Sequence, residues 1–292
     1  MHTLIVGCGY VGTALGIQLI EQGHCVWGLR RSHRNDAELT KAGIVPLVAD
    51  ITLPQGLSGL NPSYDWVVHC VSASGGGAPE YEEIYVRGTR HLLAWLSNAP
   101  PAKLVYTSST GVYGQTDGSL VDETSQTIPA APTARILVQA EELLLQSAVH
   151  RGFPSVVLRV AGIYGPGRAF WLEQFRSGTA KIEGNGERIL NMIHRDDVAG
   201  AIIAALLQGT PGRIYNAVDD EPAAQLVFLR WLSTRLGRTL PPRDVEGQNA
   251  SRKRGATNKR VSNQRLKGEL GYRLKFPTFR EGYEAIVDRE GI

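Results

Sequence analysis

The sequence predicts an α/β fold, in which helices cover a doubly wound parallel sheet and a smaller C-terminal substrate lobe follows. Short apolar runs alternate with amphipathic segments along most of the 292 residues, a pattern typical of a parallel sheet buried on both faces. A glycine-rich turn joins the first run to the first amphipathic segment. Beyond about residue 165, glycine and proline clusters loosen the alternation, which favours a separate lobe there.

Strands and helices are expected to follow one another in turn along the chain. The strands are expected near residues 3–6, 25–29, 44–49, 66–71, 103–107, 155–160 and 214–218. The helices are expected near residues 11–22, 82–97, 133–149, 196–208, 225–236 and 279–288. A ligand of such a sheet lies at the carboxyl ends of its strands. Residues that directly follow a strand are therefore the candidates for a binding site.

The first strand ends in a turn of the form G-x-G-x-x-G, and an amphipathic helix follows. A strand, this turn and a helix together form a dinucleotide-binding Rossmann unit. Gly7 permits the tight turn, Gly9 lets a pyrophosphate approach the backbone, and Gly12 lets the helix pack closely on the strand. The helix begins at Tyr10 and Val11, where free N–H groups can bind phosphate. The alternative is a glycine turn that binds no ligand.

The end of the second strand bears on the choice between NAD(H) and NADP(H). Arg30, Arg31 and Ser32 stand where NAD-binding proteins usually carry an acidic residue, and no acid follows before Asp36. An acidic side chain would repel a 2′-phosphate, whereas a guanidinium can bind it in a bidentate way. The sequence therefore predicts NADP(H), with NAD(H) as the alternative cofactor. An exposed cationic loop without a ligand is the other interpretation.

Three further strand ends should contribute to the same site, because they meet at the same edge of the sheet. The expected cofactor contacts are Asp50 and Ile51 after the third strand, Val71, Ser72 and Ala73 after the fourth, and Thr107 and Ser108 at the end of the fifth.

Composition argues against several classes of protein. The chain has 42% hydrophobic residues and a formal net charge of +3, which is too mild to indicate nucleic acid binding. No apolar run reaches the roughly 20 residues of a membrane helix, and no secretory signal is visible. Cys8, Cys25 and Cys70 lack the spacing of a metal or redox site. We therefore expect a cytoplasmic protein without metal, membrane or nucleic acid partners.

Five segments together resemble one protein family. They are the glycine turn, TSSTGVYG at 107–114, the stretch 158–168 that ends in YGPGR, NMIHRDDVA at 191–199 and YNA at 215–217. In this order they resemble the extended short-chain dehydrogenases/reductases, and in particular atypical members of the NAD(P)-dependent epimerase/dehydratase group. The resemblance implies an NADP-binding Rossmann domain at 1–164. It also implies a substrate lobe at 165–292, interleaved with returning sheet elements, and a small-molecule substrate such as a nucleotide sugar.

The resemblance also points to catalytic residues, with one serious departure. It assigns a hydroxyl that binds the substrate to Ser109, which could instead cap the turn after the fifth strand. The family's Tyr-x-x-x-Lys pair should fall at Thr133 and Leu137, so neither the phenol nor the ammonium is present, and neither replacement can take over its acid–base role. Tyr85, in the slot of the family's helix-borne Asn, is the other catalytic candidate, although a helix Tyr is usually part of the core.

Three residues are candidates for binding the substrate. Arg168 ends the YGPGR turn, close to where the resemblance places a phosphate of the substrate. Arg135 lies beside the lost tyrosine position, and His194 lies in a strand-to-helix link. A solvated helix face for Arg135 and a structural imidazole for His194 are the alternatives. The basic residues between 252 and 260 could also reach an anion, or they could be solvated.

Two functions follow from these observations. The first is an NADP(H)-binding epimerase, dehydratase or reductase that acts on a sugar-nucleotide-like or small polar substrate without the usual Tyr-x-x-x-Lys pair. The second is a catalytically silent NADP(H)-binding regulator or sensor of the same fold. A two-domain nucleotide-sugar dehydrogenase, which the GCGYVG opening also resembles, would need a catalytic Cys or Lys in its second half, and no Cys follows Cys70. Family analogy adds a homodimer through helices 82–97 and 133–149.

Overall fold

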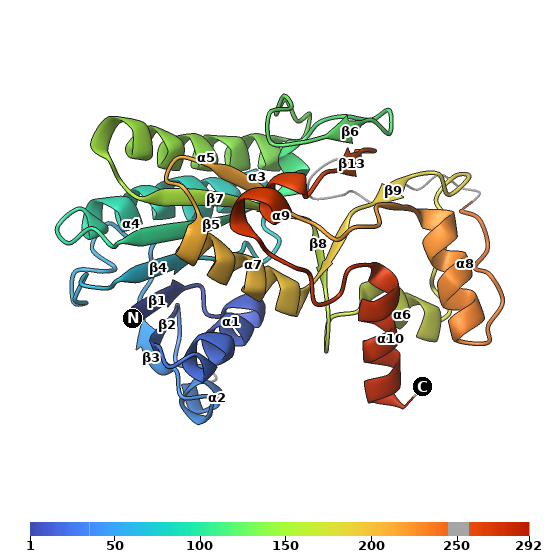
Figure 1. Ribbon diagram of the computed structural model, residues 1–292, viewed down its shortest axis with the longest axis horizontal. Helices are drawn as coiled ribbons and strands as arrows, with labels where there is room; N and C mark the ends of the chain where they lie inside the picture. The colour runs from blue at the N-terminus through green and yellow to red at the C-terminus, as the bar shows by residue number, and fades with distance from the viewer. Residues whose placement is uncertain (35, 245–256, 292) are drawn as a thin grey trace.

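A seven-stranded parallel sheet forms the centre of the computed structural model, which describes residues 1–34, 36–244 and 257–291 (Figure 1). The strands lie in the order β11-β7-β5-β4-β1-β2-β3, and each neighbouring pair is parallel. The order reverses between β1 and β4, which creates a crevice at their carboxyl ends. The predicted doubly wound Rossmann fold is confirmed. The bounds are His2–Val6 (β1), Cys25–Arg30 (β2), Val45–Val48 (β3), Trp66–His69 (β4), Lys103–Ser109 (β5), Ser155–Val160 (β7) and Ile214–Ala217 (β11).

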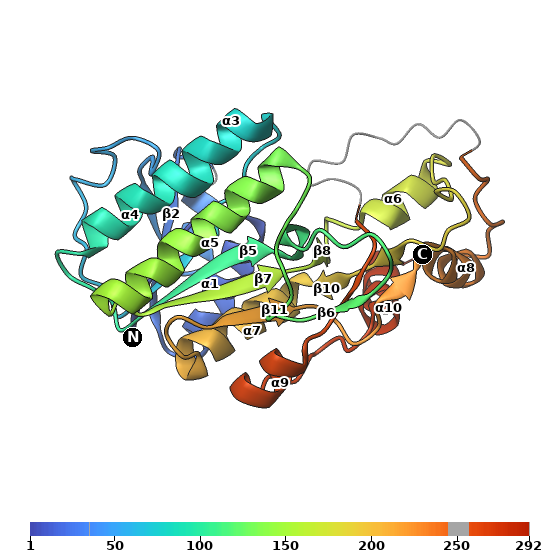
Figure 2. The same cartoon turned by 90° about the horizontal axis from the view of Figure 1, so that it is seen from above.

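Helices cover both faces of the sheet (Figure 2). On one face α1 (Tyr10–Glu21) packs against α7 (Arg195–Gln208). On the other face one helical run lies beside α5 (Pro132–Arg151). This run consists of α3 (Gly77–Tyr81), a π-helical turn (Glu82–Arg87) and α4 (Gly88–Leu96). Because both faces are covered, every residue of β4 and β7 is buried, which explains why apolar residues predominate in these strands.

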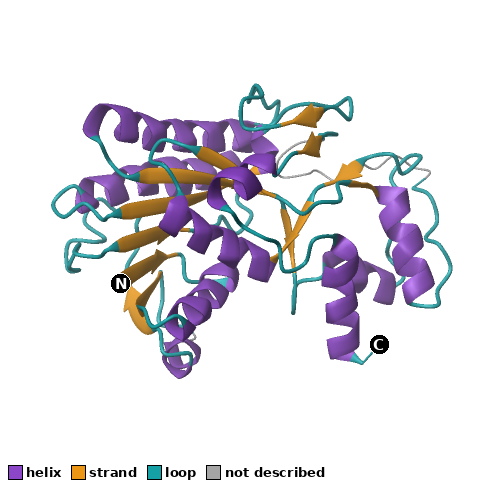
Figure 3. Ribbon diagram, viewed as in Figure 1, coloured by secondary structure: helices purple, strands orange, loops and turns teal. Residues whose placement is uncertain are grey.

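The C-terminal part of the chain builds a second, smaller core, seen apart from the sheet in Figure 3. Three helices enclose it, α6 (Phe170–Arg176), α8 (Gln225–Arg235) and α10 (Phe279–Glu290). Stacked and edge-on aromatic rings fill it, such as Tyr164 on Tyr283 with ring centroids 4.6 Å apart. Three short strand pairs connect it to the sheet, namely β8 (Gly162–Tyr164) with β10 (Met192–His194), β9 (Ile189–Leu190) with β12 (Ala223–Ala224), and β6 (Leu120–Val121) with β13 (Arg260–Val261).

The structure contains several short elements that the sequence pattern does not predict. The helices α2 (Asp36–Lys41), α6 and α9 (Gln264–Leu270) have only six or seven residues, too few for a clear helical period. The glycine-rich segment 74–79 is partly helical, since α3 begins at Gly77. Glu80 accepts hydrogen bonds from the backbone N–H groups of Ser74, Gly75 and Gly76 and so orders the segment before α3.

A histidine is buried in β4, the central strand of the sheet. His69 of β4 is fully buried, and its Nε2 shares a hydrogen bond with the Thr89 hydroxyl at 2.9 Å. Burial penalises the imidazolium form and lowers the pKa of His69 to about 3. The folded protein therefore holds this side chain neutral over most of the acid range.

We expect His69 to make the fold sensitive to acid. An unfolded histidine has a pKa of about 6.5. Below that pH the unfolded chain binds a proton that the folded chain does not. The free energy of unfolding should therefore fall as the pH decreases from about 6.5 towards 3, by up to about 1.4 kcal/mol per pH unit. Urea unfolding at several pH values should give a shallower fall for His69→Gln than for the unaltered protein. A matched change at the exposed His150 should leave the slope unchanged, and equal slopes for all three proteins would contradict the account.

Candidate functional site

The glycine turn after β1 has the geometry of a phosphate cradle. Gly7 has a φ of +91°, and a Cβ built on it would lie 2.5 Å from the Val71 nitrogen. A Cβ on Gly12 would lie 2.9 Å from both the Gly7 carbonyl oxygen and the Ile5 side chain, so this glycine lets α1 approach β1. A Cβ on Gly9 would have no neighbour closer than 3.9 Å. The space over Gly9 is therefore open, and a ligand can reach the backbone there.

The N-terminus of α1 lies directly at this open space. Its N-cap is Gly9, which provides no side-chain cap, and its first turn carries no acidic residue. The first N–H groups of a helix have no partner within the helix, and together with the helix dipole they favour an anion. An uncapped, uncharged helix start beside an open backbone therefore fits the pyrophosphate of a dinucleotide.

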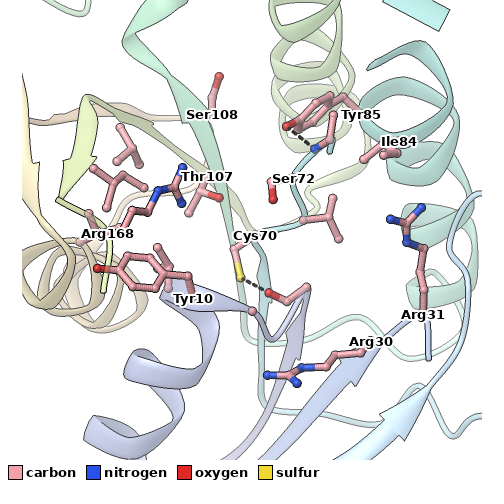
Figure 4. Close-up of a pocket in the computed structure, with 18 of the residues that line it drawn as sticks. Tyr10, Arg30, Arg31, Cys70, Ser72, Ile84, Tyr85, Thr107, Ser108 and Arg168 are labelled. Carbon is pink, nitrogen blue, oxygen red and sulfur yellow. Dashed lines mark hydrogen bonds between the residues drawn. The ribbon is translucent and has the colours of Figure 1, made fainter. Parts of the chain in front are cut away.

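A cavity of about 1060 Å³ extends from this turn along the carboxyl edge of the sheet (Figure 4). Its volume reaches the upper end of the range of ligand sites, about 300–1,000 Å³. It runs from the ends of β2 and β3 to the end of β7 and on to α6. Fifteen predicted site residues line it, namely Gly7, Gly9, Tyr10, Val11, Arg30, Arg31, Asp50, Ile51, Val71, Ser72, Ala73, Tyr85, Thr107, Ser108 and Arg168.

The two adjacent arginines after β2 have different surroundings. Arg30 donates to the Cys8 carbonyl oxygen, to the Thr13 hydroxyl at 3.1 Å and to the Arg34 carbonyl oxygen at 3.3 Å. Its guanidinium thereby holds the glycine turn against α1. Arg31 is exposed and reaches the other side of the cavity, as Figure 4 shows. Arg31 is therefore the guanidinium that is available to a ligand at this end. Ser32 is exposed and lies outside the cavity lining.

Tyr85 lines the cavity but has a structural partner. Its hydroxyl accepts a hydrogen bond from the Ala73 N–H at 3.1 Å, and its ring lies 5.0 Å from that of Tyr81. The side chain is only 4% exposed. Tyr85 thus fixes the segment that leaves β4, which is the wall of the cavity between Val71 and Ala73.

Ser109 and Ser108, at the end of β5, differ in their orientation. The Ser109 hydroxyl accepts from the Gly111 N–H at 3.0 Å and caps the short 3-10 helix Thr110–Val112. Ser109 is buried and is not part of the cavity lining. Ser108 does line the cavity, and its hydroxyl donates to Glu141 of α5 at 2.5 Å. The structure therefore gives Ser109 the role of a cap, which was the alternative from the sequence.

A buried ion pair lies beneath Ser108. Arg159 of β7 donates to both carboxylate oxygens of Glu141, the shortest distance being 2.7 Å, and both side chains are at most 4% exposed. Arg159 also donates to the Tyr113 hydroxyl at 2.9 Å, and Tyr113 donates to Asn216 at 2.8 Å. This chain of hydrogen bonds links α5, β5, β7 and β11 and reaches the cavity lining at Ser108.

The first turns of α5 do not reach the cavity. Thr133 and Leu137 are buried, and neither lines it. Among the described residues that do line it there is no lysine. Of its tyrosines, Tyr10 has its pKa raised by burial, which is opposite to the shift expected of a general base. The described lining of the cavity therefore provides no ammonium group.

Two predicted substrate contacts lie elsewhere. Arg135 is exposed and donates to the Ala130 carbonyl oxygen at 2.6 Å. His194 is 2% exposed and caps α7 by accepting from the Asp196 N–H, and burial lowers its pKa to about 4. The structure brings neither side chain to the cavity. Arg135 lies on the exposed side of α5, away from the cavity. The ring of Phe276 lies 4.0 Å from that of His194 and helps to bury the imidazole.

The basic stretch near the C-terminus is only partly described. Arg252, Lys253 and Arg254 lie outside the described residues. Lys259 belongs to the same basic stretch, but it is only 3% exposed. Its ammonium donates to the Tyr113 carbonyl oxygen and to the Thr257 hydroxyl, each at 2.9 Å, and burial lowers its pKa to about 8. Lys259 therefore anchors the returning chain behind the cavity, which no local sequence signal indicates.

A turn from the smaller lobe closes one side of the cavity. The Tyr10 hydroxyl donates to the Pro166 carbonyl oxygen at 3.1 Å. The guanidinium groups of Arg168 and Arg195 lie over the Tyr10 ring, 5.5 and 5.2 Å from its centroid. The start of α1 is thus tied to the turn that carries Arg168.

Within the described ranges, no group of three or more His, Cys, Asp or Glu side chains has a metal-binding arrangement. None of the described helices combines the length and apolar composition needed to cross a bilayer.

These features define a Rossmann protein with a dinucleotide-type crevice at its topological switch point. The model of the NAD dependent epimerase/dehydratase family matches residues 3–217. The chain therefore belongs to the NAD dependent epimerase/dehydratase family.

Known relatives resemble the chain over nearly its whole length. Protein YeeZ of Escherichia coli K12 is 28% identical, covering 94% of this chain and 95% of that protein. The 3-diazoavenalumate denitrifying reductase of a Streptomyces species is 25% identical, covering 97% of this chain and 99% of that protein. A dTDP-D-glucose 4,6-dehydratase of Bos taurus is 26% identical, covering 72% of this chain and 61% of that protein.

Solved structures agree with this assignment. A functionally unknown conserved protein from Silicibacter pomeroyi is 29% identical with a TM-score of 0.78, over 100% of this chain and 99% of that chain. DesIV, a dTDP-glucose 4,6-dehydratase from Streptomyces venezuelae solved with NAD and TYD bound, has a TM-score of 0.86 at 24% identity. That match covers 99% of this chain and 97% of that chain, and at this identity it supports the fold alone.

Proposed function

We propose that this protein is an NADP(H)-dependent oxidoreductase or dehydratase-like enzyme that acts on a small polar substrate. The observation that carries the proposal is the continuous cavity between the uncapped start of α1 and the smaller lobe, with Arg31 at its adenosine end. A nicotinamide cofactor, when bound, supplies hydride exchange. The residues of this chain bind it, orient it and close the site around it.

The parts of the cavity match the parts of NADP(H) in order. Gly9 and the N–H groups at the start of α1 are placed for the pyrophosphate. Asp50 and Ile51 line the end expected to hold the adenosine, where Asp50 accepts two hydrogen bonds from Thr52 and is thereby fixed. The nicotinamide end is then expected at Thr107 and Ser108, which line the opposite part of the cavity.

The preference for NADP(H) rests on Arg31. We expect Arg31→Ala to weaken NADPH binding by about 10–100-fold, which corresponds to the loss of a charge-assisted contact, and to leave NADH binding nearly unchanged.

Arg30→Ala is the matched control. Because Arg30 supports the glycine turn, its loss should weaken both cofactors alike. Calorimetric titration of the variants with both cofactors would check this. Equal losses for NADPH and NADH in Arg31→Ala would contradict the assignment.

Turnover is the direct test of an enzymatic role. The protein saturated with NADPH would be incubated with small ketones, aldehydes, enones and nucleotide sugars while the absorbance of the reduced nicotinamide is followed. A decrease that depends on both substrate and protein supports a reductase. A dehydratase returns the hydride to its product without net loss of the reduced cofactor, so its turnover is followed by analysis of the nucleotide sugar after incubation with the NADP⁺-loaded protein. Tyr85 and Ser109 remain the catalytic proposals from the family resemblance, although the Ser109 hydroxyl caps the short 3-10 helix and does not line the cavity. If they act in catalysis, Tyr85→Phe and Ser109→Ala should abolish turnover while cofactor binding persists.

A second candidate function is a catalytically silent NADP(H)-binding regulator or sensor. The observation that favours it is that Thr133 and Leu137 are buried away from the cavity, so α5 offers no acid or base there. This candidate predicts tight NADPH binding without turnover across the whole panel.

A further inference from the structure

The substrate end of the cavity is formed by one short stretch of chain. Among the described residues of the smaller lobe, the turn after β8 and the first turn of α6 contribute Gly167, Arg168, Phe170 and Glu173 to the lining. A guanidinium, a phenyl ring and a carboxylate thus stand within six residues of one another along the chain. A substrate beside the cofactor would meet all three groups, so their chemistry limits what it can be.

Arg168 presents a positive charge without a described counter-ion. Figure 4 shows its side chain extending from above Tyr10 towards Thr107. Arg195 lies over the same ring but pairs with Asp196 at 2.9 Å. In the described ranges, no carboxylate makes such a pair with Arg168, whose contact is the Tyr10 ring. A guanidinium held in a cavity in this way favours a carboxylate or a phosphate, which it can bind in a bidentate manner.

Phe170 and Glu173 narrow the choice of anion. Phe170 is 57% exposed although it lines the cavity, and its ring packs edge-on against Trp171 at 5.3 Å. An exposed phenyl ring on a cavity wall favours a planar apolar group of a ligand. Glu173 follows one helical turn later on the same face. Its negative charge opposes a ligand with several negative charges, such as the diphosphate of a nucleotide sugar.

We propose that the substrate is a small aromatic or conjugated monocarboxylate. Arg168 binds its carboxylate, Phe170 packs against its planar part, and Glu173 discriminates against nucleotide diphosphates. This inference rests on the proposed cofactor site, because the cofactor occupies the rest of the cavity. Arg168 and Phe170 are therefore specificity-determining residues.

The test uses trans-cinnamate as the probe, with the full-length protein saturated with NADP⁺. Calorimetry would compare trans-cinnamate with the neutral trans-cinnamamide and with UDP-glucose. We expect cinnamate to bind about tenfold or more tightly than either, because the amide carries no charge for Arg168 to pair with and the diphosphate of UDP-glucose brings more negative charge towards Glu173 than a single carboxylate does. Tighter binding of UDP-glucose, or equal binding of cinnamate and its amide, would overturn the inference.

Two arginine variants provide a matched comparison. Arg168→Gln and Arg195→Gln each remove one guanidinium from the Tyr10 ring, but only Arg168 lines the cavity. We expect Arg168→Gln to weaken cinnamate binding by about 10–100-fold and Arg195→Gln to leave it nearly unchanged. An unchanged affinity in Arg168→Gln would reject the role of Arg168.

NADP⁺ is titrated first. If NADP⁺ does not bind, the proposed function fails, whereas NADP⁺ binding without cinnamate binding rejects only the substrate class.

Discussion

Arg159→Leu is expected to lower the free energy of unfolding by about 3–5 kcal/mol, because it leaves the Glu141 carboxylate buried without its cation. Glu141 is 2% exposed, and Arg159 is its ion-pair partner at 2.7 Å. The Ser108 hydroxyl also depends on this carboxylate. Urea or guanidinium unfolding, monitored by circular dichroism, would measure the loss.

An exposed ion pair serves as the control. Arg213 and Glu269 lie 3.4 Å apart with side chains 51% and 39% exposed. Arg213→Leu should therefore change the free energy of unfolding by less than about 1 kcal/mol. Replacing Arg159 and Glu141 together by leucines should recover part of the loss, because no charge is then left buried. A loss for Arg159→Leu as small as that for Arg213→Leu would show that the pair is not desolvated.

Gly7→Ala is expected to abolish tight cofactor binding. The new Cβ would lie 2.5 Å from the Val71 nitrogen, and the residue would keep a φ of +91°, which side chains rarely adopt. The turn must then move away from β4, and the N–H groups at the start of α1 move with it. We expect NADPH to bind about a hundredfold more weakly (~2.7 kcal/mol), as measured by calorimetry on a variant whose circular dichroism shows that it is folded.

Gly23→Ala separates backbone strain from the clash. Gly23 also has a positive φ, +81°, but a Cβ there meets nothing within 4 Å. This variant should lose about 1–2 kcal/mol of stability from the backbone conformation and should bind NADPH normally. Normal binding by Gly7→Ala would mean that the glycine turn does not hold the cofactor.

The sequence predicts the sheet well and selects strand-end residues that line the cavity, for local reasons. Strands buried on both faces consist mostly of apolar residues, and Gly7 needs its positive φ whatever the distant chain does. Arg30 and Arg31 could not be told apart, because both follow the same strand. Only the fold shows that Arg30 faces Thr13 while Arg31 faces the ligand space.

The substrate half was harder to predict because it depends on distant contacts. His194 and Arg135 could each bind an anion, but neither lines the cavity. His194 is the N-cap of α7, and Arg135 lies on the exposed side of α5. Lys259 is buried by a contact with Tyr113, 146 residues away, which no local pattern can indicate. Phe170 and Glu173 belong to a seven-residue helix that follows a glycine-rich turn. The sequence predicts neither this short helix nor that these two side chains line the cavity.

The measurement that tests the central claim most directly is calorimetric titration of the unaltered protein with NADPH and with NADH. The account places the pyrophosphate at the start of α1 and a 2′-phosphate beside Arg31. It therefore predicts saturable 1:1 binding of both cofactors, with NADPH about tenfold or more tightly bound. No binding of either cofactor, or NADH bound as tightly as NADPH, would contradict it.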